Sequence, residues 1–249
     1  MEPPLPEREA RLAVMPSALV LRSRSALDEA AEEARRRGLP PATDYQKHWD
    51  NLLAVDALAG TSGPVVDLGC RSGQLLMWLY HLGRRELYGC DIRRPWPPAK
   101  KALQQGQFRT AGAAIRMYLA SGRNMRRAPA ESTEFPTGAF GAVASMSVIE
   151  HHVDTPKFFA EAARLLRPGG RLVVSTDFWP EGGETDSGVI FSSAGVERLL
   201  VEAESAGLEA PEPLLALDTP ERVIRSYTFL FLVFDRPAEA SARDGLATA

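Results

Sequence analysis

Three side chains that can accept a proton follow two apolar runs in the second half of the sequence. His151 and His152 come directly after "FGAVASMSVIE", and Asp177 ends the run "GGRLVVSTD". Histidine has the ordinary pKa closest to neutrality, and a carboxylate can do similar work when burial raises its pKa. The pattern predicts a general base among these three residues. Neighbouring side chains rarely point the same way, so at most one histidine is expected to face a substrate.

A glycine-containing turn marks a second place where chemistry can occur. The stretch "VVDLGCRSGQ" runs apolar residues into Asp67, and then places Gly69 and Gly73 before another apolar run. Glycine lets the backbone approach a ligand, and a following helix offers free N–H groups. Asp91 ends the next apolar run, where a carboxylate can accept both hydrogens of a ribose diol. These residues favour an adenosine-type ligand, with a plain tight connection and a solvated acid as the alternatives.

Short strands and helices that alternate from residue 64 onward must position these side chains. We expect strands at 65–68, 86–92, 124–131, 140–147, 169–176 and 226–235. Helices are expected at 73–83, 156–166 and 194–207, and the stretch 97–121 is expected to be mostly helical with interruptions at Gly106 and Gly112. This alternation predicts an α/β fold, a doubly wound, Rossmann-like, seven-stranded and mainly parallel sheet with helices on both faces. Ligands of such sheets lie beyond the carboxyl ends of the strands, where the proton acceptors and the glycine turn are expected to meet.

The sequence resembles the class I S-adenosylmethionine-dependent methyltransferases. "VVDLGCRSG" is similar to their first motif, "YGCDI" to the acid of their second strand, and "SVIEHH" with "LLRPGG" to their middle block. The similarity covers roughly residues 60–207 and points to the small-molecule branch, called methyltransferase type 11, that includes ubiquinone and menaquinone biosynthesis. It implies S-adenosyl-L-methionine as the cofactor and a small molecule as the methyl acceptor.

The resemblance also implies which residues contact the cofactor, and most of them follow the expected strands. The cofactor-binding residues that it implies are Asp67, Gly69, Cys70, Gly73, Asp91, Ile92, Glu131, Ser132, Met146 and Ser147. Two positions depart from the family pattern. Arg71 replaces the usual middle glycine, so this position is expected to do without ready access to positive φ. Glu131 replaces the more common aspartate.

An oxygen acceptor is favoured, because a histidine or a carboxylate would be available to take the proton of a hydroxyl group. Methylation of nitrogen or carbon, which needs less base assistance, remains an alternative within enzymes. A cofactor-binding partner subunit without turnover remains an alternative from another class. The acids Asp67, Asp91 and Glu131 are all present, which favours the enzyme.

Composition limits the possible partners. The chain has 249 residues, 45% of them hydrophobic, and a net charge of −3, which fits one large domain without a strong field for nucleic acid or anionic membrane. No Asn/Asp-Pro-Pro-Tyr/Phe motif follows the fourth strand. The sequence has neither a membrane-length apolar run nor a start typical of a signal peptide, so we expect a cytoplasmic protein with reduced cysteines. No metal site is expected beside the histidines, and the oligomeric state stays open.

The chain divides into three expected parts. Residues 1–59 are predicted to form an N-terminal helical extension or lid, residues 60–236 the S-adenosylmethionine-binding domain, and residues 237–249 a flexible tail. Helices are expected at 25–39 and 45–58, with residues 1–20 loose. Tyr45, His48 and Trp49 would share one face of the second helix, either as part of a lid over the cofactor or as plain packing. The basic stretch 94–127 is read as a solvated face, with an acidic acceptor as the alternative.

Overall fold

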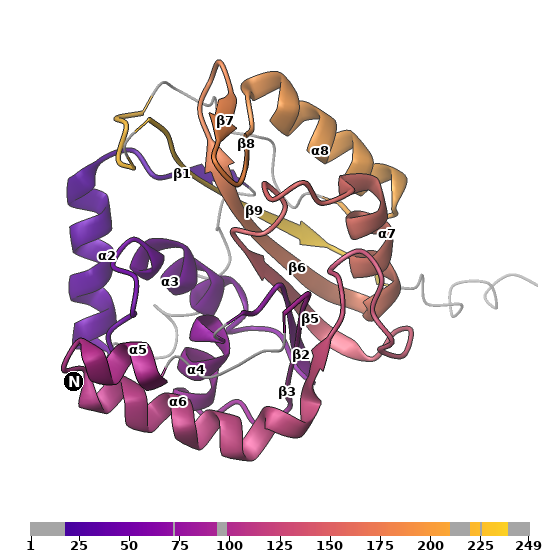
Figure 1. Cartoon of the computed structure of the whole chain (residues 1–249). Helices are drawn as coiled ribbons and strands as arrows, with labels where there is room; N and C mark the ends of the chain where they lie inside the picture. The colour runs from indigo at the N-terminus through magenta and orange to yellow at the C-terminus, as the bar shows by residue number, and fades with distance from the viewer. Residues whose placement is uncertain (1–17, 72, 94–98, 210–219, 225, 239–249) are drawn as a thin grey trace, which may run out of the picture.

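The structure is a computed structural model that describes residues 18–71, 73–93, 99–209, 220–224 and 226–238. Its centre is a seven-stranded sheet in the order β1-β9-β6-β5-β2-β3-β4 (Figure 1). The strands are β1 (Ala18–Val20), β2 (Val65–Leu68), β3 (Leu87–Asp91), β4 (Met125–Arg127), β5 (Phe140–Met146), β6 (Leu166–Phe178) and β9 (Thr228–Asp235). The neighbours from β4 to β6 pair in parallel, while β9 is antiparallel to both β6 and β1. The expected mainly parallel α/β fold is confirmed.

Helices cover both faces of this sheet (Figure 1). They are α2 (Arg24–Arg36), α3 (Lys47–Ala57), α4 (Gln74–His81), α5 (Ala99–Gln104), α6 (Phe108–Ser121), a short 3₁₀ turn η1 (Gly122–Asn124), α7 (Thr155–Leu165) and α8 (Ser193–Ser205). Local signals explain their ends. The side chain of Asp154 caps α7 by accepting from the N–H of Lys157, and Ser192 caps α8 by accepting from Gly195. Gly106, at φ +71°, separates α5 from α6.

Alternating side chains of β9 divide the core into two halves. Phe229, Phe231 and Val233 belong to the half covered by α2, α3, α4 and α6, whereas Leu230 and Leu232 belong to the half under α7 and α8. This alternation is expected of a strand with both faces buried. Each half therefore fixes one layer of helices against the sheet.

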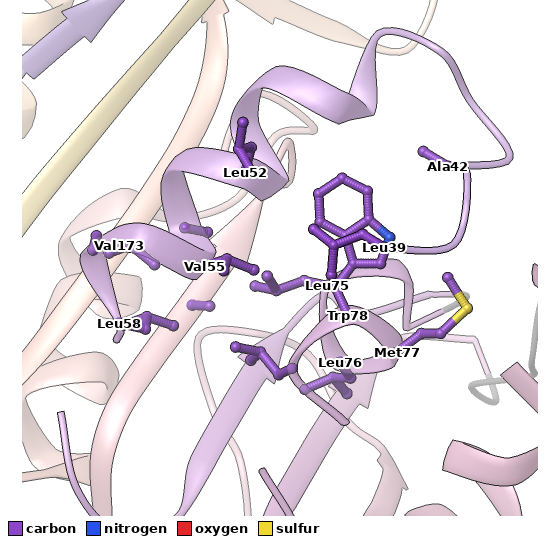
Figure 2. Close-up of a cluster of buried hydrophobic side chains, with 14 of the residues drawn as sticks. Leu39, Ala42, Leu52, Val55, Leu58, Leu75, Leu76, Met77, Trp78 and Val173 are labelled. Carbon is purple, nitrogen blue, oxygen red and sulfur yellow. The ribbon is translucent and has the colours of Figure 1, made fainter. Parts of the chain in front are cut away.

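The half beneath α3 and α4 holds the N-terminal segment in place. Figure 2 shows Leu52 and Val55 of α3 beside Leu75 and Trp78 of α4. The indole N–H of Trp78 donates to the carbonyl oxygen of Pro40 at 2.8 Å, which ties the segment before α3 to this core. Burial of a tryptophan together with its polar hydrogen makes the contact both apolar and directional.

The order of the strands creates a switch point between β2 and β5. From β2 the chain moves outward through β3 to β4, and from β5 it moves the other way to β6. The connections at the carboxyl ends of β2 and β5 consequently diverge and leave a crevice between them, which is the usual ligand position in open α/β sheets. Asp67 lies on one of these two strands and Met146 ends the other.

Four parts of the structure differ from the expectations, and one of them is α6, which runs through Gly112 without the expected interruption. Residues 1–20 were expected to be loose, but Ala18–Val20 form β1 and pair with Leu230–Leu232 of β9. The hairpin of β7 (Gly183–Thr185) and β8 (Gly188–Ile190) was not expected. Helix α2 is capped by Ser23, two residues before the start expected at 25. Residues 1–17 and most of the predicted tail, 239–249, lie outside the described residues.

Candidate active site

A cavity of about 970 Å³ opens at the switch point. Its walls come from the turns after β2 and β5, the carboxyl end of β6, the start of α3 and the exposed side of α5. The predicted site residues that line it are Asp67, Gly69, Cys70, Met146, Ser147, His151 and Asp177. Residues far apart in the sequence are thus brought to one cavity.

The turn after β2 depends on backbone geometry. Gly69 and Gly73 have φ values of +77° and +65°. A Cβ atom added at Gly69 would lie 2.4 Å from a methyl carbon of Val148, in the turn after β5. Gly69 is therefore required for the contact between the two turns, in addition to any role toward a ligand.

Arg71 takes a positive φ of +40°, so the expectation that a non-glycine residue would avoid that region here is wrong. Its N–H donates to Oδ2 of Asp91 at 2.9 Å, and the N–H of Arg93 donates to Oδ1 of the same carboxylate at 2.8 Å. These two hydrogen bonds offset the strain of the left-handed conformation. Asp91 thus fixes the two loops that follow β2 and β3.

The other predicted cofactor residues surround this region without lining the cavity. The side chain of Ile92 is 65% exposed beside Asp91, as a cover over a bound ring would be. Oε1 of Glu131 accepts from the N–H of Asp154 at 3.3 Å, and Ser132 is exposed. Gly73 is the N-cap of α4. The contacts of these residues with a cofactor stay predictions.

Asp67 is a buried carboxyl with an unused acceptor atom. Its side chain is 3% exposed and lines the cavity, and its Oδ1 has no hydrogen-bond partner among the described residues. Burial, together with the nearby carboxyl of Asp91, raises the pKa of Asp67 to about 8. A ligand that brings a cationic or N–H donor would satisfy this atom, so the site fits the ammonium group of a methionine portion.

A lysine that the sequence analysis missed stands beside these turns. Nζ of Lys47, on α3, donates to Oδ2 of Asp50 at 2.9 Å and to the hydroxyl of Ser147. Asp50 is fully buried, and its Oδ2 also accepts from the hydroxyl of Ser175 at 2.9 Å. The spacing of three residues between Lys47 and Asp50 in a predicted helix was the one local signal for this pair.

Two further carboxyls lie at the ends of β5 and β6. Glu150 is 1% exposed and accepts from the hydroxyl of Thr176 at 3.1 Å, and burial raises its pKa to about 8. Asp177 is 6% exposed, and burial raises its pKa to about 6 against the opposing effects of Lys47 and His151. Glu150 was not predicted, although it directly precedes the histidine pair. Together with Asp67, these residues form what we call the acidic floor: Asp67, Glu150 and Asp177.

The two histidines occupy different environments. His151 is exposed, lines the cavity and places Nδ1 3.0 Å from the carbonyl oxygen of Ser187. His152 is exposed with φ +57° and does not line the cavity. Whether either histidine faces a substrate stays a prediction. Among the described residues, no group of three or more His, Cys, Asp or Glu side chains is arranged to hold a metal ion.

The mouth of the cavity carries the opposite charge. We call its four exposed cations the basic rim: Arg71, Arg93, Lys100 and Lys101. Lys101 forms an ion pair of 2.6 Å with Asp44 in the segment before α3. Exposed pairs of this kind contribute little to stability, so their effect is on how a charged ligand approaches.

The remaining predictions concern the helix face of Tyr45, His48 and Trp49, and the two cysteines. Trp49 is buried and meets Phe231 edge to face, and the ring of His48 is buried with its Nδ1 2.7 Å from the carbonyl oxygen of Tyr45. These contacts favour plain packing over a lid for this part of α3. Cys70 and Cys90 are buried and free. No helix in the described part of the chain has the length and apolar character needed to span a membrane.

Comparison with known proteins shows similarity to methyltransferases over the middle of the chain. Residues 66–174 match the family model described as a methyltransferase domain. The chain is 33% identical to an uncharacterized methyltransferase of Mycobacterium bovis over 135 residues, which are 53% of this chain and 59% of the relative. It is 30% identical to a tRNA U34 carboxymethyltransferase of Idiomarina loihiensis (57% and 42% covered) and 27% identical to a ubiquinone biosynthesis O-methyltransferase of Sinorhizobium medicae (45% and 40% covered).

Solved structures share the fold. The cyclase SpnF has a TM-score of 0.55 at 18% identity, with 86% of this chain and 93% of that chain covered. A geranyl diphosphate C-methyltransferase of Streptomyces coelicolor A3(2) has a TM-score of 0.51 at 20% identity, with 90% and 88% covered. The chain spans 59% or less of the length of the three curated relatives. Over residues 66–174 the chain is thus similar to methyltransferase domains, and it shares its fold with these solved structures.

Proposed function

We propose that this protein is an S-adenosylmethionine-dependent methyltransferase that acts on a small-molecule acceptor. The observation that carries the proposal is the buried, unpaired Oδ1 of Asp67 in the cavity at the switch point. An uncompensated buried acceptor is costly unless a ligand supplies a donor. The match of residues 66–174 to the methyltransferase domain family supports the choice of ligand.

The β2–β3 side of the cavity would hold the cofactor. Asp67 would accept from the ammonium of the methionine portion, and the N-terminus of α4 would face its carboxylate. Each carboxylate oxygen of Asp91 accepts one hydrogen bond, Oδ2 from the N–H of Arg71 and Oδ1 from the N–H of Arg93. Each oxygen can still accept a further hydrogen bond from a ribose hydroxyl. When bound, the cofactor supplies an activated methyl group on a sulfonium.

The acceptor would lie toward the ends of β5 and β6. Met146 and Ser147 would stand beside the transferred methyl group, with His151 and Asp177 within the same cavity. We favour an oxygen acceptor, because Asp177, with its pKa near 6, is ionised at neutral pH and can take the proton of a hydroxyl group. His151 is the second candidate for this role.

Other functions are distinguished by particular observations. We expected no nucleic-acid substrate. The relatives do not support this expectation, because one of them is named a tRNA U34 carboxymethyltransferase. The net charge of −3 gives the chain no overall attraction for a phosphate-rich polymer, and the basic rim is limited to four cations at the mouth of a cavity with an acidic floor, so we favour a small molecule. SpnF, a cyclase by name, shares the fold, so the fold alone does not separate methyl transfer from other reactions. Methyl transfer to nitrogen or carbon would depend less on Asp177 or His151 acting as a general base.

Two measurements test the proposal in sequence. Titration calorimetry with S-adenosylmethionine should show binding by the purified chain. Incubation with a panel of small hydroxyl, amine and activated-carbon compounds, followed by mass spectrometry, should then reveal an acceptor that gains one methyl group. Absence of cofactor binding would reject the proposal, whereas binding without any methylated product would favour the non-catalytic partner subunit.

A further inference from the structure

Charge is separated along the chain. Residues 92–130 hold nine of the 29 lysines and arginines and none of the 32 aspartates and glutamates, so this segment carries +9 and the rest of the chain −12. The net charge of −3 conceals this separation. All of the described cations in the segment are exposed. A negatively charged surface would therefore attract this segment and repel the remainder of the molecule.

Helix α6 is the longest element of the segment and lies at the outer edge of the molecule (Figure 1). One of its faces packs into the core through Ala113, Ala114 and Met117. The opposite face carries large apolar side chains at spacings of seven and four residues, which place them in one line along the helix. We call them the apolar stripe: Phe108, Ile115 and Leu119, which are 74%, 43% and 81% exposed.

The apolar stripe is part of a concentration of exposed apolar side chains. Among the described residues, eight large hydrophobic side chains are exposed, and four of them lie on α5 and α6. The fourth is Leu103 of α5, which packs beside α6. A solvated helix normally has polar side chains at its most exposed positions, whereas the two most exposed of the eight, Leu119 and Phe108, are on α6. Grouping of this kind indicates a contact surface.

Arginines border the apolar stripe. Arg109 and Arg116 each follow a stripe residue directly and so lie along one side of it, and Arg123 comes just after the end of α6. Within the part of the chain that the structure describes, these three arginines form no ion pair. Their charges are therefore available to an anion outside the chain.

We propose that α6 and the cations beside it dock on the surface of an anionic phospholipid membrane. The apolar stripe would enter the headgroup region, while Arg109, Arg116 and Arg123 would meet lipid phosphates. A helix that lies in the membrane surface combines these two features, because apolar burial and attraction to anionic lipid add to each other. The contact is peripheral, since the other face of α6 stays packed on the core. It does not depend on the proposed function.

Other occupants would use only half of this pattern. RNA would engage the arginines, but Ile115 and Leu119 can neither stack on bases as aromatic rings do nor bond to phosphates. A second copy that presented the same face would bring its own arginines against these, with no carboxylate between residues 92 and 130 to compensate. A membrane surface uses both the charges and the apolar stripe.

Flotation of the full chain with phosphatidylcholine vesicles, either pure or with about one third phosphatidylglycerol, tests this proposal. Partitioning to the anionic vesicles should be at least about tenfold stronger and should weaken as salt is added. Leu119→Gln should lower this partitioning about tenfold through lost apolar burial. Arg116→Gln should lower it about fivefold, the effect of one cation near an anionic surface.

Helix α8 supplies the matched controls. Val201→Gln and Arg198→Gln are exposed changes of the same two kinds, on a helix that also carries acidic residues. Both should partition as the unaltered chain does. Thermal unfolding followed by circular dichroism should be nearly the same in all four variants, because each altered side chain is exposed. A loss of partitioning then reports the surface and not the fold.

Three results would overturn the proposal. The first is equal partitioning of the unaltered chain to neutral and anionic vesicles, or none to either. The second is equal partitioning of Leu119→Gln and Val201→Gln, which would leave the apolar stripe without a role. The third is another occupant without vesicle binding: an RNA oligonucleotide whose affinity falls in Arg116→Gln alone, or a dimer in sedimentation that Leu119→Gln dissociates. Binding of S-adenosylmethionine is measured separately, so none of these results bears on the proposed function.

Discussion

The two halves of the cavity are built in different ways. On the β2–β3 side, Gly69 and Asp91 set the path of the backbone. The carboxylate of Asp91 holds the two loops by accepting hydrogen bonds from main-chain N–H groups. On the α3–β5–β6 side, the buried ionisable side chains of Lys47, Glu150 and Asp177 come together from three distant segments. The comparison shows that the backbone half depends on local conformation, whereas the charged half depends on the whole fold being assembled.

Gly69→Val should damage the backbone half most. The added branched carbon would enter the space of Val148 at a residue with φ +77°, so both overpacking and backbone strain apply. We expect a loss of about 4 kcal/mol in the free energy of unfolding, measured by chemical denaturation. The substitution should also abolish cofactor binding, and the contact with Val148 means that this loss will accompany a loss of stability.

Gly83→Ala is the control for this prediction. Gly83 has φ +98°, but no atom lies within 4 Å of its added Cβ position. The Gly83→Ala variant therefore measures only the cost of a positive φ at a residue with a side chain, which should lower the free energy of unfolding by about 1 kcal/mol. Equal losses for the two variants would show that the contact between the two turns is unimportant.

The charged half is tested by separating the candidate bases. Of His151→Ala, His152→Ala and Asp177→Asn, one should lower kcat at least about a hundredfold on the identified acceptor. The cavity favours Asp177 or His151, because His152 does not line it. Cofactor affinity, measured by calorimetry near neutral pH, should change far less than kcat. Near-normal kcat in all three variants would favour an amine or an already ionised acceptor.

The pH dependence of the methyl-transfer rate further tests which residue is the base. A base must be unprotonated, so the rate should fall below its pKa. Burial raises the pKa of Asp177 to about 6, close to the ordinary value for histidine. An inflection near pH 6 is therefore expected if Asp177 is the base, and it should disappear in Asp177→Asn.

Lys47→Met sharpens the contrast between buried and exposed charges. The substitution leaves the fully buried Asp50 without its cation. We expect the free energy of unfolding to fall by about 2 to 3 kcal/mol at pH 7. This is less than for a completely buried pair, because the Lys47 side chain is 22% exposed. Lys157→Met, which breaks the exposed pair with Asp154, is the matched control and should cause no measurable change. Similar melting curves for both variants would contradict the importance assigned to Lys47.

Asp91→Ala returns to the backbone half with a smaller effect. Loss of two charge-assisted hydrogen bonds to a ribose diol should weaken S-adenosylmethionine binding by about 2 kcal/mol in calorimetry. Because Asp91 also holds the N–H groups of Arg71 and Arg93, Asp91→Asn should be compared. The amide oxygen retains one loop contact, so an intermediate affinity is expected. Unchanged affinity in both variants would remove Asp91 from the cofactor site.

The fold was predictable where local pattern determines structure. The apolar run at 65–68 is β2 itself, and the run at 86–92 contains β3, because both are buried on two faces and read as continuous hydrophobic segments. Strand β1 could not be found in this way. Its three residues acquire their conformation from Leu230–Leu232, more than 200 residues further along the chain.

The site divides in the same manner. Asp67, Gly69 and Asp91 stand in short motifs, so their positions at the switch point followed from sequence. Lys47 was missed because a lysine in an amphipathic helix is ordinarily solvated, and only the packing of α3 beside Ser147 brings it into the cavity. Glu150 carries no local sign that Thr176 will be its partner.

The position of β9 has a consequence for the order of synthesis. It leaves the ribosome after every other strand described here, yet it lies between β6 and β1. Its Phe229 and Phe231 also form the surface beneath α3, with Nζ of Lys47 5.1 Å from the centre of the Phe229 ring. Helix α3 is synthesised early but can pack against this surface only after β9 has formed. A nascent chain stalled before residue 228 would therefore contain the glycine turn after β2 but lack the aromatic surface against which Lys47 lies.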